Sequence, residues 1–205
     1  MRYLLPYARQ GQVIGLLGGS FDPAHDGHVL ITTSALKRFG LDEVWWLVTP
    51  GNPLKPVGPA PMKRRLGYAR YVMQHPRVKI TNIESHLQTR YTAQTLRKLK
   101  HHYRGVTFVW LMGADNLAQF DQWRDWHEIM ATTKIGVMAR PGERVAAKMS
   151  KAAKIFAKRR ISSRASQTLT RREGNTQNKA GKWCFINVPM SGSSSSKIRQ
   201  KGTWG

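Results

Sequence analysis

Cysteine, acidic residues and long apolar runs are all scarce in this 205-residue chain, and each shortage excludes a class of protein. The lone cysteine, Cys184, cannot form a disulfide within the chain or a cysteine-rich zinc site, which fits a reducing cytoplasm. No stretch approaches the roughly 18 apolar residues of a membrane span, and the N-terminal apolar run is too short for a signal peptide. We therefore expect a cytoplasmic protein with no membrane partner.

Negative charge is also in short supply. The chain has 34 Lys and Arg residues against 11 Asp and Glu residues, which gives a formal net charge of +23. Such an imbalance is typical of proteins that bind polyanions or phosphate-bearing ligands, and it says nothing about the fold. The hydrophobic content of 40% nevertheless predicts a globular protein, and the length is enough for one domain with a substantial core.

Short apolar runs alternate with helical patterns along most of the chain. The predicted strands span residues 13–17, 44–48, 78–83, 106–112, 134–139 and 183–188, and the predicted helices span 28–39, 62–74, 92–102, 123–130 and 145–160. This alternation, with nearly continuous apolar strands, indicates a parallel sheet covered on both faces. The sequence therefore predicts an α/β fold with a doubly wound sheet.

Residues 141–182 interrupt the alternation. They contain twelve Lys or Arg residues and only two acidic ones. Residues 145–160 can form a basic helix, whereas the polar stretch 162–182 is predicted to be a mobile loop. We interpret the segment as a basic insertion before the last strand of a single domain that spans 1–205. Residues 183–205 are expected to form that strand and a C-terminal helical element.

The stretch GGSFDPAHDGH, residues 18–28, directly follows the first predicted strand. A strand, a glycine turn and a helix start form a phosphate site, because Gly18 and Gly19 let the backbone approach an anion and the helix N-terminus favours negative charge. His25 and His28 can then donate hydrogen bonds that strengthen in a transition state. Two alternatives remain: a metal site, for which no third ligand is evident, and an ordinary helix cap.

The same eleven residues closely resemble the G-G-x-F-D-P-x-H-x-G-H signature of the nucleotidyltransferase superfamily with the H-x-G-H motif. The resemblance implies a Rossmann-like fold and transfer of a nucleotidyl group from a nucleoside triphosphate to a phosphorylated acceptor. SSSSKIR, residues 193–199, is similar to the I-S-S-T-x-I-R element of these enzymes, with Ser193 and Ser196 replacing the usual Ile and Thr. That element opens a helix that holds the triphosphate, and a flexible serine linker is the alternative.

Three further stretches resemble the nicotinate-nucleotide adenylyltransferase branch. They are RYTAQTL (90–96), GADNLAQFDQW (113–123) and ARPG (139–142), and the similarity as a whole spans residues 13–142 and 183–199. The resemblance implies transfer of the adenylyl group of ATP to nicotinate mononucleotide by in-line displacement, giving deamido-NAD and pyrophosphate. It also implies Mg²⁺ held mainly by ATP, with no metal ligand from protein side chains.

The resemblance assigns two sets of binding residues. The ATP site is expected to contain Gly18, Gly19, Ser20, Phe21, His25, His28, Gly113, Asp115, Ser194, Ser195, Ile198 and Arg199. The nicotinate mononucleotide site is expected to contain Asn52, Lys55, Tyr91, Thr92, Trp123, Arg124 and Arg140. The expected catalytic residues are His25, His28 and Arg199: the histidines stabilise the transferring phosphoryl group, and the arginine holds the departing pyrophosphate.

Trp123 offers a flat face for a pyridine ring, and aromatic stacking is worth about 0.5–1.5 kcal/mol beyond area burial. In the branch that the chain resembles, this tryptophan stacks on the nicotinate ring, and the residue matching Thr92 helps to hold its carboxylate. Arg124 stands where an aromatic residue is common, which leaves a cation near that carboxylate. Without the resemblance, Trp123 can be a core residue, Asp115 a helix cap and Lys55 a solvated loop lysine.

Other functions remain open at this point. KMSKA, residues 148–152, resembles the K-M-S-K-S loop of class I aminoacyl-tRNA synthetases, but the chain is short for such an enzyme and SSSSKIR already fills the equivalent role. Nicotinamide mononucleotide and phosphopantetheine are alternative acceptors. A basic RNA-binding module built on 141–182 is the alternative from a different class, although we do not expect a nucleic-acid partner. The sequence leaves the oligomeric state open, a homo-oligomer included.

Overall fold

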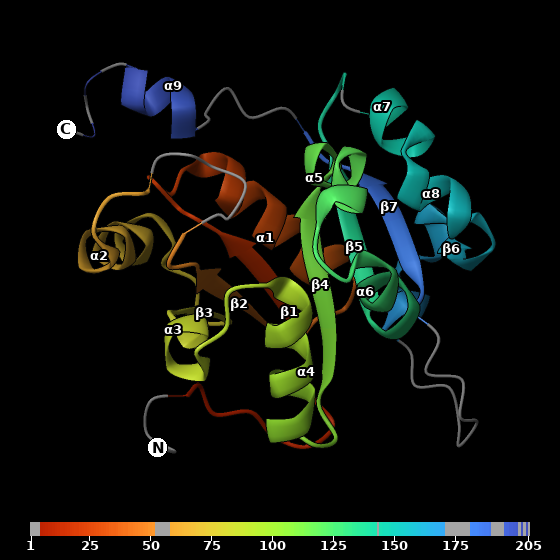
Figure 1. Cartoon of the computed structure of the whole chain (residues 1–205), viewed down its shortest axis with the longest axis horizontal. Helices are drawn as coiled ribbons and strands as arrows, with labels where there is room; N and C mark the ends of the chain where they lie inside the picture. The colour runs from red at the N-terminus through yellow and green to blue at the C-terminus, as the bar shows by residue number, and fades with distance from the viewer. Residues whose placement is uncertain are drawn as a thin grey trace.

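The computed structural model describes residues 5–51, 58–142, 144–170, 181–189 and 195–200, together with residues 202 and 204. Within these ranges, seven strands form one sheet in the order β3-β2-β1-β4-β5-β7-β6, and every neighbouring pair is parallel (Figure 1). The strands are β1 (Val13–Gly19), β2 (Glu43–Val48), β3 (Val78–Thr81), β4 (Thr107–Gly113), β5 (Lys134–Ala139), β6 (Arg160–Ile161) and β7 (Trp183–Asn187). The strand order reverses between β1 and β4.

Helices cover both faces of this sheet. The α-helices are α1 (Asp26–Arg38), α2 (Met62–Val72), α3 (Ile83–Leu87), α4 (Thr92–His102), α5 (Ala114–Ala118), α6 (Trp126–Thr132), α7 (Arg144–Met149), α8 (Lys151–Ile155) and α9 (Ser195–Gln200), and the 3₁₀ helices are η2 (Phe120–Gln122), η3 (Ala157–Arg159) and η4 (Ser163–Leu169). Apolar residues of α1, α2 and η4 pack in one core layer, and those of α3 to α8 pack in the other. None of the helices in the described ranges is long and apolar enough to cross a membrane.

The two tryptophans of β2 show why the strands are apolar throughout. Successive side chains of a strand point to opposite faces of the sheet. Trp45 therefore packs in one core layer, with its ring 5.3 Å from that of Tyr103, and Trp46 packs in the other, stacked 4.7 Å from Phe21. Both indoles are fully buried. A strand buried on both faces has no polar face, so its sequence reads as a continuous apolar run.

The predicted fold is confirmed: it is a Rossmann-like, doubly wound parallel sheet. Each predicted strand corresponds to a strand of the structure, and each predicted helix before the basic insertion corresponds to a helix; α4 and β5 have the predicted bounds. The helices α3 and α5 were not predicted. Each has five residues and directly follows a strand, which is too short a stretch to show a helical period.

The basic helix predicted over 145–160 is two shorter helices, α7 and α8. Ser150 stands between them, and its side chain accepts a hydrogen bond from Ala153 N (3.3 Å), which caps the start of α8. The chain then forms β6, an edge strand paired with β7. The basic insertion therefore contributes a strand to the sheet, which the sequence analysis did not anticipate.

The mobile loop predicted over 162–182 is also not what the structure shows in its first half. Here η4 packs beneath the end of α1, with Leu169 fully buried. The hydroxyl of Ser166 donates to Arg38 O (2.8 Å), and that of Thr170 donates to Phe39 O (2.7 Å). These two bonds satisfy carbonyl groups left open at the helix C-terminus. The second half of the stretch lies mostly outside the described residues.

Candidate functional site

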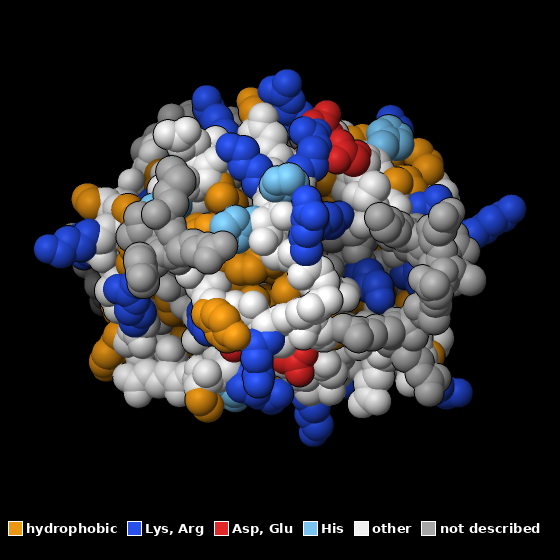
Figure 2. All heavy atoms as spheres, turned by 90° about the horizontal axis from the view of Figure 1, so that it is seen from below, with side chains coloured by type: hydrophobic (Ala, Val, Ile, Leu, Met, Phe, Trp, Pro, Cys, Tyr) orange, Lys and Arg blue, Asp and Glu red, His pale blue; other side chains and the backbone are white. Residues whose placement is uncertain are grey.

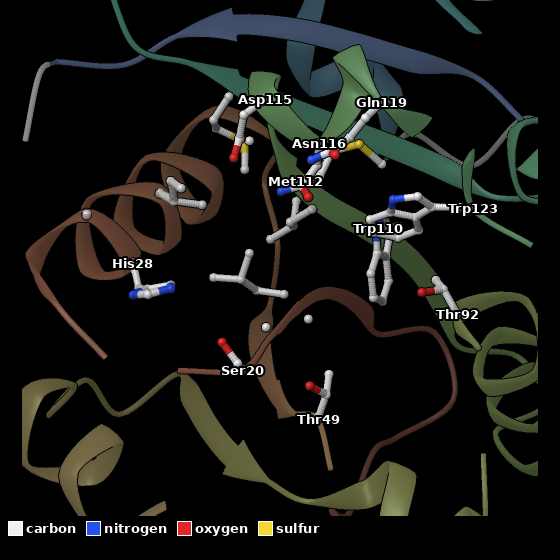
Figure 3. Close-up of a pocket in the computed structure, with 18 of the residues that line it drawn as sticks. Ser20, His28, Thr49, Thr92, Trp110, Met112, Asp115, Asn116, Gln119 and Trp123 are labelled. Carbon is white, nitrogen blue, oxygen red and sulfur yellow. The ribbon is translucent and has the colours of Figure 1, made fainter. Parts of the chain in front are cut away.

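A cavity of about 790 Å³ lies at the carboxyl ends of β1 and β4, where the strand order reverses. In open parallel sheets this crevice is where ligands bind, and the volume is in the range of small-molecule sites. Figure 3 shows His28 on one side of the cavity and Trp110, Trp123 and Thr92 on the opposite side. The predicted residues that line it are Gly18, Gly19, Ser20, His25, His28, Tyr91, Thr92, Gly113, Asp115, Trp123, Arg124 and Arg140.

His25 and His28 form a reciprocal cap at the start of α1. The amide of Gly27 donates to Nδ1 of His25 (3.0 Å), and the amide of His25 donates to Nδ1 of His28 (3.2 Å). A neutral imidazole that accepts at Nδ1 carries its proton on Nε2. Both rings therefore present an Nε2–H donor, and their centroids are 4.0 Å apart. The helix cap and a ligand-binding role are compatible, because each uses a different ring nitrogen.

Burial keeps both rings neutral near pH 7. Loss of hydration is the main cause that lowers the pKa of His28 to about 3, and the neighbouring His25 and Arg140 lower it further. The pKa of His25 is lowered by burial and by Arg140, against a smaller opposing effect of Asp26. A neutral ring with such a low pKa is a poor proton acceptor but a good hydrogen-bond donor. The pair is therefore suited to stabilising negative charge.

The depressed pKa of His28 makes acid-dependent destabilisation an expected result. In the unfolded chain this imidazole takes up a proton below pH 6.5, whereas in the folded chain it stays neutral down to about pH 3. The stability that it contributes is thus fully present above pH 6.5 and is lost as the pH falls towards 3. Because the unfolded chain takes up one proton more than the folded chain, the free energy of unfolding falls by about 2 kcal/mol between pH 6.5 and 5.

Glu84 lines the same cavity, and burial raises its pKa to about 7. Its titration therefore changes the stability in the opposite sense, so the comparison needs a reference that lacks only the His28 titration. His28→Asn keeps an acceptor for the His25 amide and does not ionise. We expect the difference in unfolding free energy between the parent and His28→Asn, measured by urea denaturation, to shrink by about that amount from pH 6.5 to 5. A difference that stays constant with pH would mean an ordinary histidine pKa.

Gly18 and Gly19 were expected to form a turn, but they are the last two residues of β1, and Gly18 has a packing reason that the sequence did not reveal. A Cβ atom on Gly18 would lie 2.6 Å from the ring of Trp110, so only glycine fits there. Phe21 adopts a left-handed backbone conformation (φ 47°), and its buried ring stacks on Trp46 and lies 4.6 Å from the ring of His28. Phe21 is not among the cavity-lining residues; it supports His28 from the core side.

The opposite side of the cavity is aromatic and cationic. The half-buried indole of Trp123 meets Trp110 edge to face, at 6.2 Å between ring centroids, and packs 5.0 Å from Phe120. The guanidinium of Arg124 lies 4.8 Å above the ring of Tyr91. Edge-to-face packing fixes the indole of Trp123 and leaves one face of it available for a stacked ring. The guanidinium of Arg124 adds affinity for an anion. This end therefore suits a flat, negatively charged aromatic group.

Several cavity-lining residues were missed by the sequence analysis. They are Thr49, Gly51, Glu84, Arg90, Trp110, Met112, Asn116, Gln119 and Gln122, among others. Trp110 and Met112 belong to β4 and also pack in the core. Asn116 and Gln119 follow Asp115 within one helical turn or so, and Figure 3 shows them on the same wall of the cavity. Asn116 and Gln119 are polar residues that come just after a predicted strand, and this position could have identified them as candidate site residues.

The C-terminal motif lies beside the glycine–histidine motif. The hydroxyl of Ser195 donates to Pro23 O (2.8 Å), and the guanidinium of Arg199 donates to the carbonyl of Asp22 and lies 3.8 Å from its carboxylate. The indole of Trp204 also donates to that carboxylate (2.7 Å). Ser195, Ile198 and Arg199 are not cavity-lining residues, so their predicted contact with a triphosphate stays a prediction. Ser194, Asn52 and Lys55 lie outside the described residues.

A metal site built from side chains finds no support. In the described parts of the chain, no group of three His, Cys, Asp or Glu side chains could hold a metal ion. His25 and His28 use Nδ1 for backbone hydrogen bonds, and the carboxylates that line the cavity are Asp115 and Glu84.

Positive charge predominates on one face of the protein and is also present at the cavity. On the face shown in Figure 2, Lys and Arg side chains lie on all sides and acidic side chains are few. Three arginines also line the cavity: Arg90, Arg124 and Arg140. Charge of one sign around a cavity steers ligands of the opposite sign towards it.

Comparisons with known proteins agree with this geometry. Residues 16–201 match the family described as cytidylyltransferase-like. The "Probable nicotinate-nucleotide adenylyltransferase" of Roseobacter denitrificans is 61% identical over 204 residues, covering 100% of both chains. The protein of the same name from Ruegeria pomeroyi is 58% identical, covering 100% of this chain and 93% of its own. The chain belongs to the nicotinate-nucleotide adenylyltransferase family.

The fold of this family is also seen in solved structures. Nicotinic acid mononucleotide adenylyltransferase from Plasmodium falciparum, in one structure complexed with NaAD, aligns with a TM-score of 0.67 over 92% of this chain and 83% of its own. A structure of the same protein complexed with APC aligns equally well. Their sequence identities of 19% and 16% support a shared fold only. Membership of the nicotinate-nucleotide adenylyltransferase family rests on the bacterial relatives.

Proposed function

We propose that this protein transfers the adenylyl group of ATP to nicotinate mononucleotide, releasing pyrophosphate and forming deamido-NAD. One observation carries the proposal: the cavity combines two neutral histidine donors on one side with an indole face and a cation on the other. Figure 3 shows His28 and Trp123 on these two sides. The first side suits a phosphoryl group and the second suits a nicotinate ring. The names of the bacterial relatives support the same activity.

The reaction needs positioning rather than acid–base chemistry. The 5′-phosphate of the acceptor is already anionic at pH 7, so no residue has to remove a proton to create the nucleophile. An oxygen of that phosphate bonds to the α-phosphorus of ATP, and the bond from this phosphorus to the bridging oxygen of the β-phosphate breaks. Pyrophosphate leaves with that oxygen. The protein must hold two anions in line and stabilise the charge that develops between them.

His25 and His28 are assigned to that stabilisation, through their Nε2–H groups. Arg199 and Ser195, with Ser194, are assigned to the departing pyrophosphate, and Gly18, Gly19 and Ser20 to the phosphates through backbone amides. Magnesium bound to the triphosphate would neutralise part of its charge, and Asp115 is the carboxylate that could reach its water shell. Because burial raises the pKa of Glu84 to about 7, that residue is a weaker candidate for a cation.

The aromatic end of the cavity supports a nicotinate acceptor over the alternatives. Arg124 places a cation beside Trp123, where a pyridine carboxylate gains from it and a neutral carboxamide does not. Phosphopantetheine has neither an aromatic ring for Trp123 nor a carboxylate for Arg124. We assign Tyr91, Thr92, Trp123, Arg124 and Arg140 to nicotinate mononucleotide.

The test of this function is pyrophosphate release from ATP and Mg²⁺, with nicotinate mononucleotide and nicotinamide mononucleotide run side by side. We expect a strong preference for the nicotinate form. Equal or reversed preference would contradict the assignment of Trp123 and Arg124. If neither compound supports pyrophosphate release, the proposed acceptor is wrong, although the family membership still holds. Phosphopantetheine would then be tested as the acceptor.

Trp123→Ala is expected to raise KM for nicotinate mononucleotide about tenfold, because a tenfold change corresponds to about 1.4 kcal/mol, the upper part of the range for aromatic stacking. KM for ATP should stay within twofold, since Trp123 lies across the cavity from His28. Trp123→Phe should recover most of the affinity. Steady-state kinetics with each substrate varied in turn checks the result, and an equal rise in both KM values would place the indole elsewhere.

A further inference from the structure

Glu84 is a buried carboxyl group that the proposed mechanism does not use. It lies in α3 at the wall of the cavity and is only 4% exposed. Among the described residues, its carboxylate accepts a hydrogen bond from Thr95 of α4, whose hydroxyl is 3.1 Å from Oε1. A carboxyl group is costly to bury, and it is retained at such a place only where a partner or a function compensates.

The Thr95 hydroxyl is the centre of a small buried network. Besides Glu84, it lies 2.8 Å from Oγ1 of Thr89 and 3.3 Å from the carbonyl oxygen of Tyr91. Thr89 and Thr95 are both buried, and the amide of Thr89 donates to the carbonyl of Glu84 (3.0 Å). Glu84, Thr89 and Thr95 thus tie the end of α3 to the turn before α4. That turn carries Tyr91 and Thr92 to the cavity.

The direction of these hydrogen bonds depends on the charge of Glu84. A hydroxyl has one hydrogen to donate. When Glu84 is ionised it can only accept, so Thr95 donates to it and Thr89 donates to Thr95. When Glu84 is protonated it can donate to Thr95, which frees the Thr95 hydrogen for the carbonyl of Tyr91. The protonation state of the acid therefore changes how the turn is held.

We propose that Glu84 is a positioning residue for the acceptor: through Thr95 and Thr89, its carboxyl group holds the turn that presents Tyr91 and Thr92 to nicotinate mononucleotide. This inference rests on the proposed function, because that function assigns Tyr91 and Thr92 to the acceptor. Glu84 touches neither substrate in this role. It affects KM for nicotinate mononucleotide and does not affect the phosphoryl-transfer step, which depends on the histidines.

The proposal includes a pH dependence with a definite sign. Burial raises the pKa of Glu84 to about 7, and the hydrogen bond from Thr95 opposes the rise. The charged and titratable groups that face the same cavity are His25, His28, Arg90, Asp115, Arg124 and Arg140, and α4 adds Lys98, whose Nζ donates to Leu87 O at the end of α3. An acceptor that brings further negative charge disfavours ionised Glu84, so it binds the protonated form more tightly.

The first arm of the test follows Glu84 itself, in the protein without substrate. Carbon-13 NMR of labelled glutamate side chains should show one carboxyl group that titrates near pH 7 and disappears in Glu84→Gln. Thr95→Val keeps the shape of the threonine and removes its hydroxyl, and it should shift that titration to higher pH. A titration near 4.5 in the parent protein would overturn the proposal, whatever the enzyme acts on.

The second arm is kinetic. Glu84→Ala and Thr95→Val should raise KM for nicotinate mononucleotide about tenfold, with kcat and KM for ATP within twofold, and Thr95→Ser should behave like the parent. Glu84→Gln resembles the protonated acid, so it should keep the parent's low KM at pH 6. The ratio of parent to Glu84→Gln KM should rise from pH 6 to 8, a comparison that cancels the titration of the acceptor phosphate.

Glu43→Gln is the matched control, because Glu43 is a part-buried carboxyl at the other end of the sheet, paired with Lys79. It should leave every kinetic constant unchanged. A fall in kcat and a rise in both KM values in Glu84→Ala and Thr95→Val would indicate a general structural role and overturn the proposal. If the parent protein does not turn over nicotinate mononucleotide, the proposed function fails, and the NMR arm still decides whether the network exists.

Discussion

His28→Ala is expected to lower kcat for adenylyl transfer about 10²–10³-fold, the usual loss when one donor to a developing negative charge is removed. The ring of His28 is buried and neutral, with Nδ1 engaged by the His25 amide and Nε2–H left for the cavity. KM for both substrates should change much less than kcat, because the donor matters most in the transition state. Rapid-quench measurement of a single turnover checks the chemical step directly.

Two further variants separate this donor from the helix cap. His28→Asn retains an acceptor for the His25 amide and lacks a donor at the Nε2 position, so it should be nearly as inactive as His28→Ala but more stable. His28→Gln can place its amide nitrogen near the former Nε2 and should recover part of the activity. His127→Asn, on the exposed side of α6, is the control and should be unaffected. Full activity in His28→Asn would contradict the donor role.

Arg65→Ala is expected to destabilise the protein by about 3–4 kcal/mol. This arginine of α2 is 2% exposed, and its guanidinium donates to three carbonyl oxygens: Ala60 O (2.6 Å), Ser20 O (2.7 Å) and Thr49 O (2.8 Å). Hydrogen bonds from a charged donor contribute about 1.5–3 kcal/mol each, and the variant leaves buried carbonyls without a partner. The expected fall in Tm is about 10 °C for a chain of this size.

The same arginine holds the cavity in shape, so activity should fall with stability. Ser20 and Thr49 line the cavity at the ends of β1 and β2, and Arg65 joins the two. Arg65→Lys offers a single ammonium in place of the planar guanidinium and should restore less than half of the lost stability. Arg70→Ala, on the exposed face of the same helix, should stay within 0.5 kcal/mol of the parent, a limit typical of surface sites. Urea denaturation of the three variants measures these differences.

Much of the fold could be predicted from local patterns. The strands are buried on both faces, so the apolar runs around Val44–Val48 and Thr107–Gly113 stand out in the sequence. Gly18 and Gly19 end β1, and they mark where the chain leaves the strand on its way to α1. What failed were elements without a period of their own, such as α3 and α5, and the basic insertion. There, high charge favoured a mobile loop, and the buried Leu169 and two side-chain caps decided otherwise.

The candidate site was predictable where its residues follow strand ends. Gly18 to His28 and Gly113 to Trp123 each begin where a strand finishes, and parallel strands bring those ends to one edge of the sheet. Glu84 was not predictable in the same way. Its importance comes from the burial of its carboxyl group and from Thr95, which belongs to the following helix. A single charged residue in a short polar stretch carries no such signal.

The sequence by itself determined the family, the class of reaction and the two halves of the cavity, because these depend on motifs whose residues are close along the chain. Only the tertiary structure decided which ring nitrogen of His25 and His28 faces the cavity, which carbonyls Arg65 holds, and that burial raises the pKa of Glu84. Each of those properties depends on the groups that folding brings near a side chain and on the water that it removes. Neither can be read from the order of the residues.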